Sequence, residues 1–147
     1  MKAFNVFFLL MSLTVLIQCK STQSASGKPT ATLINTYWKL AEANGERIET
    51  PAGVREVHII LTVENNENRL KGFAGCNNIG GSFKQDQNKL TFSAFSTKMM
   101  CPNQQMKLEN FLLDLLSATD NYLIKGEDLM LLEGDTELAI FKAVYLK

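Results

Sequence analysis

Histidine and cysteine are scarce in this 147-residue chain, which contains one histidine and three cysteines. The chain therefore has few of the residues from which a histidine-based catalytic triad or a catalytic zinc site is built. The chain also has no excess charge of either sign, since 15 basic side chains are balanced by 15 acidic ones. That balance argues against a protein that binds nucleic acid by neutralising phosphates. We accordingly expect no metal site, no cofactor and no nucleic-acid partner.

The rest of the composition is that of a folded protein. Hydrophobic residues make up 46% of the chain and aromatic residues 9%, which is typical of a globular domain and not of a disordered segment. The length suits one domain rather than two. Composition names no activity here, but the N-terminal sequence indicates where the protein is found.

One long hydrophobic run is present, from Ala3 to Ile17 after Lys2. It is shorter than the roughly 20 apolar residues that cross a bilayer, and it fits a secretory signal peptide. The run ends at Gln18-Cys19 and resembles a bacterial lipobox, although Gln18 replaces the small residue usual before the cysteine. The alternative is an ordinary signal peptide with an incidental cysteine. We expect Cys19 to carry acyl chains that anchor the protein in the bacterial cell envelope, at the outer membrane.

The predicted organisation has three parts. Residues 1–18 are the lipoprotein signal peptide, and residues 19–32 are a flexible tether because residues 20–32 contain no large apolar side chain. Residues 33–147 form the domain. If Cys19 carries lipid, Cys76 and Cys101 remain in a compartment that permits disulfides. The residues alone leave two interpretations open, a disulfide or two buried thiols.

Short alternating segments separated by turn residues predict an antiparallel sheet. The clearest strand is Val57–Val63, and Asn44-Gly45 ends an earlier one near Ala43. A hairpin is expected around a three-residue loop at 86–88. One helix is expected from Pro102 to about Ser117, packed on the sheet rather than lying on a membrane. The expected fold is α+β, with a curved antiparallel β-sheet of about eight short strands packed against one main helix.

A glycine-rich segment spans residues 72–82. Its spacing resembles that of a phosphate-binding loop, but Gly81 occupies the position of the essential lysine and no helix follows. Glycines beside strands more often mark bulges and close approaches of the backbone. We therefore interpret the segment as structural.

Several motifs in order along the chain resemble those of a known family. They are Trp38-Lys39-Leu40, Gly72, Gly75-Cys76-Asn77, Gly80 or Gly81, Ser96-Thr97-Lys98-Met99, Cys101 and Glu109-Asn110-Phe111. Together they resemble the META domain of HslJ-like, heat-shock-inducible lipoproteins, from about Leu33 to Lys142. The resemblance implies a bent antiparallel α+β fold, an envelope location and a link to stress tolerance, including resistance to antibiotics such as novobiocin. It implies no catalytic residues, and it favours pairing of Cys76 with Cys101.

Enzymatic alternatives rest on few residues. His58 is expected at an outward position of its strand, as an ordinary surface residue. Cys101 lies near a helix N-terminus and could act as a nucleophile, but it would need His58 as its base. Asp135 and Glu137 fall at a turn, where solvated charge is usual. Asn77 and Thr97 are interpreted as polar groups that complete backbone hydrogen bonds.

Two functions are therefore expected from the sequence. The first is a membrane-anchored, non-enzymatic stress-response module that binds another envelope protein. The alternative is a binder of a small apolar ligand or lipid on the concave face of the sheet. A pocket lined by Trp38, Phe73 and Phe92 would favour the alternative, whereas solid packing there and an exposed apolar patch elsewhere would favour the first.

Overall fold

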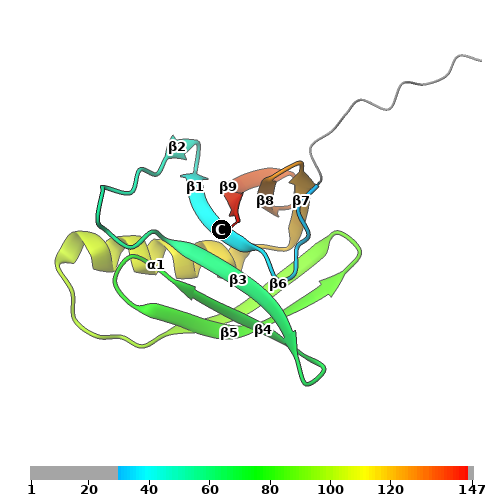
Figure 1. The fold of residues 1–147 in the computed structure, drawn as a ribbon, viewed down its shortest axis with the longest axis horizontal. Coiled ribbons are helices and arrows are strands. Elements are labelled where there is room, and N and C mark those ends of the chain that lie inside the picture. Colours follow the sequence, from blue (N-terminus) through cyan, green and yellow to red (C-terminus); the bar gives the residue numbers. More distant parts are fainter. Residues whose placement is uncertain (1–29, 146–147) are drawn as a thin grey trace, which may run out of the picture.

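The computed structural model describes residues 30–145 as nine strands and one helix (Figure 1). The predicted signal peptide, Cys19 and most of the tether lie outside the described residues. The elements, in chain order, are β1 (Tyr37–Ala43), β2 (Glu46–Arg47), β3 (His58–Glu64), β4 (Glu67–Phe73), β5 (Asn78–Asp86), β6 (Lys89–Ser96), α1 (Asn103–Ala118), β7 (Asn121–Lys125), β8 (Asp128–Glu133) and β9 (Thr136–Val144).

The strands form one antiparallel sheet in the order β2-β1-β3-β4-β5-β6-β7-β8-β9, and it curves until β1 also pairs with β9. The sheet is weakest between β6 and β7, where a single residue pair, Lys89 and Asn121, is in register. The helix α1 packs against β6 beside this weak pairing. The predicted α+β fold, with a curved antiparallel sheet and one main helix, is confirmed.

Three details differ from the prediction. A ninth strand, the two-residue β2, pairs with the end of β1. The hairpin between β5 and β6 has a two-residue loop, because Asp86 pairs with Lys89 and Gln87 takes a positive φ of 53°. The helix begins at Asn103 because the preceding residue, Pro102, is extended, with φ −53° and ψ 142°.

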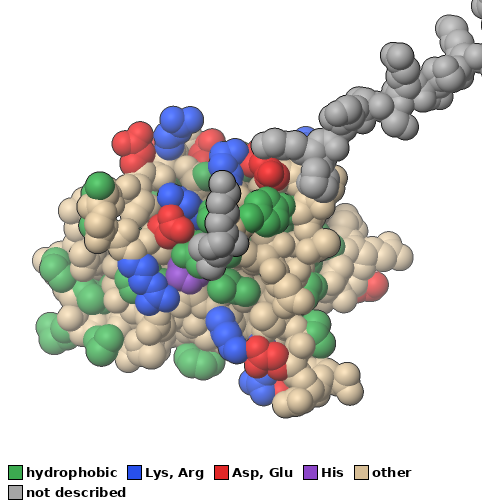
Figure 2. All heavy atoms as spheres, in the orientation of Figure 1, with side chains coloured by type: hydrophobic (Ala, Val, Ile, Leu, Met, Phe, Trp, Pro, Cys, Tyr) green, Lys and Arg blue, Asp and Glu red, His purple; other side chains and the backbone are tan. Residues whose placement is uncertain are grey.

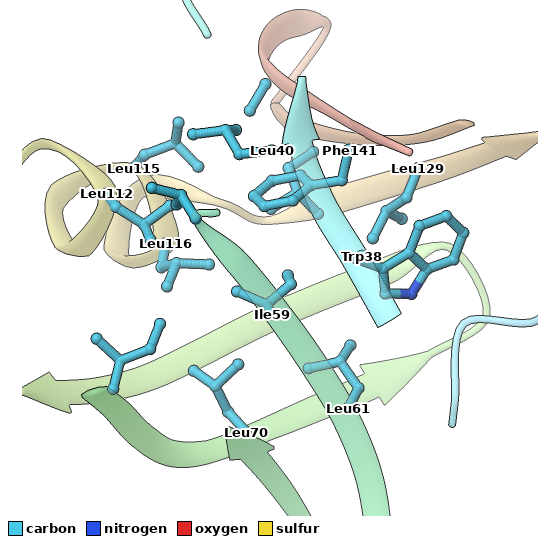
Figure 3. Close-up of a cluster of buried hydrophobic side chains, with 14 of the residues drawn as sticks. Trp38, Leu40, Ile59, Leu61, Leu70, Leu112, Leu115, Leu116, Leu129 and Phe141 are labelled. Atoms are coloured by element: carbon cyan, nitrogen blue, oxygen red, sulfur yellow. The ribbon is translucent and has the colours of Figure 1, made fainter. Parts of the chain in front are cut away.

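The core fills the inside of the curved sheet (Figure 3). It is built from alternate residues of the strands and from one face of α1, and the largest fully buried side chains include Trp38, Leu40, Ile59, Leu61, Leu112, Leu116, Leu129 and Phe141. The indole Nε1 of Trp38 donates a hydrogen bond to the carbonyl of Leu33 at 3.1 Å, so its polar atom is satisfied inside the core. Burial begins at Ala31, which is 8% exposed.

This packing bears on the proposed apolar pocket. Trp38 has no exposed surface and pairs with Ile59 of β3. Phe73 pairs with His58, the neighbour of Ile59, so Phe73 and Trp38 lie on opposite faces of the sheet. Trp38, Phe73 and Phe92 therefore do not line one pocket, and side chains occupy the interior that a ligand would need.

Candidate functional site

Asn77 is the centre of the most elaborate polar arrangement in the described chain. It lies between β4 and β5 and is 2% exposed. Its Nδ2 donates to Oε2 of Glu109 at 2.8 Å and to the carbonyl of Met99 at 2.9 Å. Its Oδ1 accepts from Oγ1 of Thr97 at 3.0 Å and from the backbone N–H of Met99 at 2.9 Å. We call Asn77, Thr97, Met99 and Glu109 the asparagine node, and in it the amide uses both donors and both lone pairs.

Glu109 supplies the charge of the node. It lies on α1, 32 residues beyond Asn77, and is 6% exposed. Its Oε2 accepts from both the backbone N–H and the Nδ2 of Asn77, at 3.0 and 2.8 Å. Among residues 30–145 no lysine or arginine forms an ion pair with it. The buried carboxylate is therefore stabilised by neutral donors and not by a cation.

A disulfide between Cys76 and Cys101 stands beside the node, with 5.9 Å between the two Cα atoms. The structure thus selects the bridge over the alternative of two buried thiols. It closes a loop of 25 residues, a cross-link worth about 3 kcal/mol in the chain-entropy model. It also occupies the thiol of Cys101 that the nucleophile hypothesis would use.

The node and the disulfide together hold residues 97–101 in place. Both residues that flank Lys98 bind the Oδ1 of Asn77, and Lys98 takes a left-handed φ of 53°. That conformation is uncommon for a residue with a side chain and persists where neighbouring contacts impose it. Met99 is 64% exposed and Met100 is 92% exposed. The result is a tethered segment that presents two methionines to solvent. Figure 2 shows hydrophobic side chains along the lower left of this face of the molecule.

The glycines of the predicted motif are explained by close contacts. A Cβ on Gly72 would lie 2.2 Å from the carbonyl oxygen of His58, and one on Gly81 would lie 2.0 Å from that of Ser93. Both distances are far below van der Waals contact with backbone atoms that cannot move aside. Similar but looser contacts occur at two further positions, Gly75 against Leu108 and Gly80 against the ring of Phe95. The segment lets strands and helix approach closely, as the structural interpretation predicts.

His58 is a correction to the sequence analysis. His58 does lie on the outer face of β3, opposite the core residue Ile59, but the predicted surface exposure is wrong, because His58 is only 5% exposed. Its ring stacks on Tyr37 with 4.3 Å between centroids, and its Nδ1 lies 3.0 Å from the carbonyl oxygen of Glu56. Burial lowers the pKa of His58, and burial together with the nearby Glu56 carboxylate raises the pKa of Tyr37. The outer face of β3 is thus covered by side chains from neighbouring segments.

Other predicted residues lie away from the node. Trp38 belongs to the core, and Asp135 and Glu137 are exposed at the turn into β9, as expected. Within residues 30–145 no group of three or more His, Cys, Asp or Glu side chains is placed to hold a metal ion. In the same part of the chain no helix has the length and apolar character needed to cross a membrane.

Sequence reasoning named each member of the node but not the contacts among them. It gave no role to Met100 and placed Met106 only on the apolar surface of the helix, whereas both line one surface hollow together with Met99. The adjacent pair Met99-Met100 was the available signal, since two neighbouring methionines between a strand and a helix cannot both be buried easily.

Comparisons with known proteins add a family and a fold. The family model described as META domain matches residues 31–145. An NMR structure of a protein from Burkholderia xenovorans is similar, with a TM-score of 0.63 and 20% sequence identity over 86% of this chain and 97% of that one. A second NMR structure has a TM-score of 0.58 and 20% identity, over 76% of this chain and 94% of that one. No curated protein matches the chain significantly.

Proposed function

Because the chain belongs to the META domain family, we propose that it is a lipid-anchored protein of the bacterial cell envelope whose domain binds another envelope protein. In this proposal the domain is not an enzyme, and its binding contributes to tolerance of heat or antibiotics. The anchoring rests on the lipobox-like sequence that ends at Cys19. The stress role rests on the resemblance to HslJ-like lipoproteins.

The observation that carries the binding role is the fixed methionine segment. The amide of Asn77 is saturated by partners within the protein, and Cys76 and Cys101 are joined to each other. These polar groups bond to one another and hold the loop in place. The loop in turn exposes Met99 and Met100. Methionine is polarisable and conformationally adaptable, which suits a surface that packs against a partner.

The tether supports contact with other envelope proteins. A chain that runs from Cys19 to the first described residue, Thr30, can extend to about 35 Å. If residues 19–32 form the expected tether, the domain could reach a membrane partner within that distance of its anchor.

A photo-crosslinking experiment tests this proposal. Benzoylphenylalanine is introduced at position 100 in one strain and at position 91 in a control strain, because Thr91 is also exposed but lies on β6 away from the methionines. After irradiation of intact bacteria, we expect a discrete crosslinked protein from position 100 and not from position 91. No crosslink from position 100, or the same products from both positions, would contradict the proposed binding surface.

A further inference from the structure

Methionine is unevenly distributed in the chain. Six methionines occur in the sequence, and Met1 and Met11 lie within the predicted signal peptide. Of the other four, Met99, Met100 and Met106 line one surface hollow of about 310 Å³ beside the asparagine node. The fourth, Met130, lies in β8.

The hydrogen bonds of the node explain why the three methionines border the same hollow. The backbone of Met99 is held by Asn77 through both its N–H and its carbonyl. Met106 precedes Glu109 by three residues on α1, so the two side chains lie on the same face of the helix. Since Glu109 is bound to Asn77, this face is turned toward the segment that carries Met99 and Met100.

Polar residues also line the hollow, and two of them bear on what it could bind. One is Glu109, a buried carboxylate without an ion-pair partner in the described chain. The other is Ser96, whose buried Oγ has no hydrogen-bond partner among residues 30–145. The hollow is therefore bordered by three methionines, by a buried glutamate that accepts two hydrogen bonds from Asn77, and by a hydroxyl without a partner in the described chain. A cation in the hollow would add to the stabilisation that these hydrogen bonds give the Glu109 carboxylate.

We propose that this hollow binds a soft monovalent cation, Cu(I), through the thioethers of Met99, Met100 and Met106. Thioether sulfur selects Cu(I) over the harder cations that prefer oxygen. Glu109 provides the compensating charge, and the disulfide keeps Cys76 and Cys101 from acting as thiolate ligands. Lys98 also borders the hollow, but it is exposed and its long side chain can extend its ammonium group into solvent. The inference does not rest on the proposed function, although both use the side chains of Met99 and Met100.

The test is a competition titration of the full chain in detergent, without thiol reductants. Cu(I), kept reduced by ascorbate under anaerobic conditions, is supplied as its bicinchoninate complex, and transfer to the protein is followed by the loss of the complex's colour. We expect one Cu(I) to be withdrawn per chain. The triple variant Met99→Leu/Met100→Leu/Met106→Leu should withdraw none, while the matched control Met130→Leu should behave as the unmodified chain does. Leucine conserves the volume of methionine, so the fold is expected to persist.

A further variant probes the charge. In Glu109→Gln the amide oxygen can still accept both hydrogen bonds from Asn77, so the node is retained while the negative charge is lost. We expect its affinity for Cu(I) to fall by about tenfold. As an independent readout, Ag(I) added to protein labelled with ¹³C at the methionine methyl groups should shift the resonances of Met99, Met100 and Met106. The proposal is overturned if the unmodified chain withdraws no Cu(I), or if the triple variant withdraws as much as the control.

Discussion

Replacing Asn77 by alanine should destabilise the protein more than any other substitution of an uncharged polar side chain in the described chain. The change removes four hydrogen bonds to oxygen and nitrogen partners, two donated by Nδ2 and two accepted by Oδ1, together with a weaker one from Nδ2 to the sulfur of Cys76. A neutral hydrogen bond contributes about 1 kcal/mol and one to a charged group about 2 kcal/mol. Water that enters the vacated space recovers part of this, so we expect a loss of about 4 kcal/mol in the free energy of unfolding.

The assay is thermal and urea unfolding of the oxidised protein, followed by circular dichroism. A loss of this size lowers Tm by roughly 15 °C for a domain of about 115 residues. The matched control is Asn78→Ala at the next position, where the amide is exposed and accepts one hydrogen bond from Arg55 at 2.8 Å. We expect the control to lose less than about 1 kcal/mol.

A second variant separates hydrogen bonding from volume. Asn77→Asp keeps the size of the side chain but places a carboxylate oxygen where Nδ2 now lies, 2.8 Å from Oε2 of Glu109. Two buried carboxylates at that distance repel each other, so this variant should be at least as unstable as Asn77→Ala at neutral pH. Stabilities of both variants within about 1 kcal/mol of the Asn78→Ala control would refute the reasoning.

Three further predictions concern the surroundings of the node and the buried histidine. Cys76→Ser should lower the free energy of unfolding by about 3 kcal/mol, and reduction with dithiothreitol should then have no further effect; an undiminished Tm would rule out a stabilising bridge to Cys101. Gly72→Ala should lower the free energy of unfolding in urea by more than about 2 kcal/mol, because its Cβ would lie 2.2 Å from a backbone oxygen. In the control Gly126→Ala, the Cβ has no atom within 4 Å, so the loss should be about 1 kcal/mol, from the positive φ alone. Burial lowers the pKa of His58 from 6.5, so the unfolded chain binds a proton more readily than the folded one, and stability should fall as pH decreases below about 6.5, by up to about 1.4 kcal/mol per pH unit. Urea unfolding of His58→Phe should show a flatter dependence between pH 7 and 5.5, and an unchanged slope would contradict the assignment.

The local elements could be predicted from the sequence because their signals are local. Alternating apolar residues identified β3, and the turn residues Asn44-Gly45 marked the end of β1. The pairing of β1 with β9 was not predictable in this way, since it joins segments about 100 residues apart. Nothing in the sequence of either strand identifies the other as its pairing partner.

The error at His58 has a similar cause. Alternation shows that His58 and Ile59 point to opposite faces of β3, but it does not show whether the outer face is covered. In the folded chain Tyr37, from another strand, covers it.

The residues of the candidate site could be predicted from the sequence, but the contacts among them could not. Asn77, Thr97, Met99 and Glu109 were all recognised from the family resemblance, and the disulfide was one of two open interpretations. The hydrogen bonds between Asn77 and Glu109, and the hollow that gathers three methionines, depend on how α1 packs against β6. That packing is a tertiary property that no local pattern encodes.

The most direct test of the whole account is the intact mass of the protein extracted from bacterial membranes, alkylated with and without prior reduction. The account predicts a chain that begins at Cys19, carries acyl mass, and gains two alkyl groups only after reduction. A chain without acyl mass would contradict the anchor. Two cysteines alkylated without reduction would contradict the disulfide between Cys76 and Cys101 that helps to fix the methionine segment.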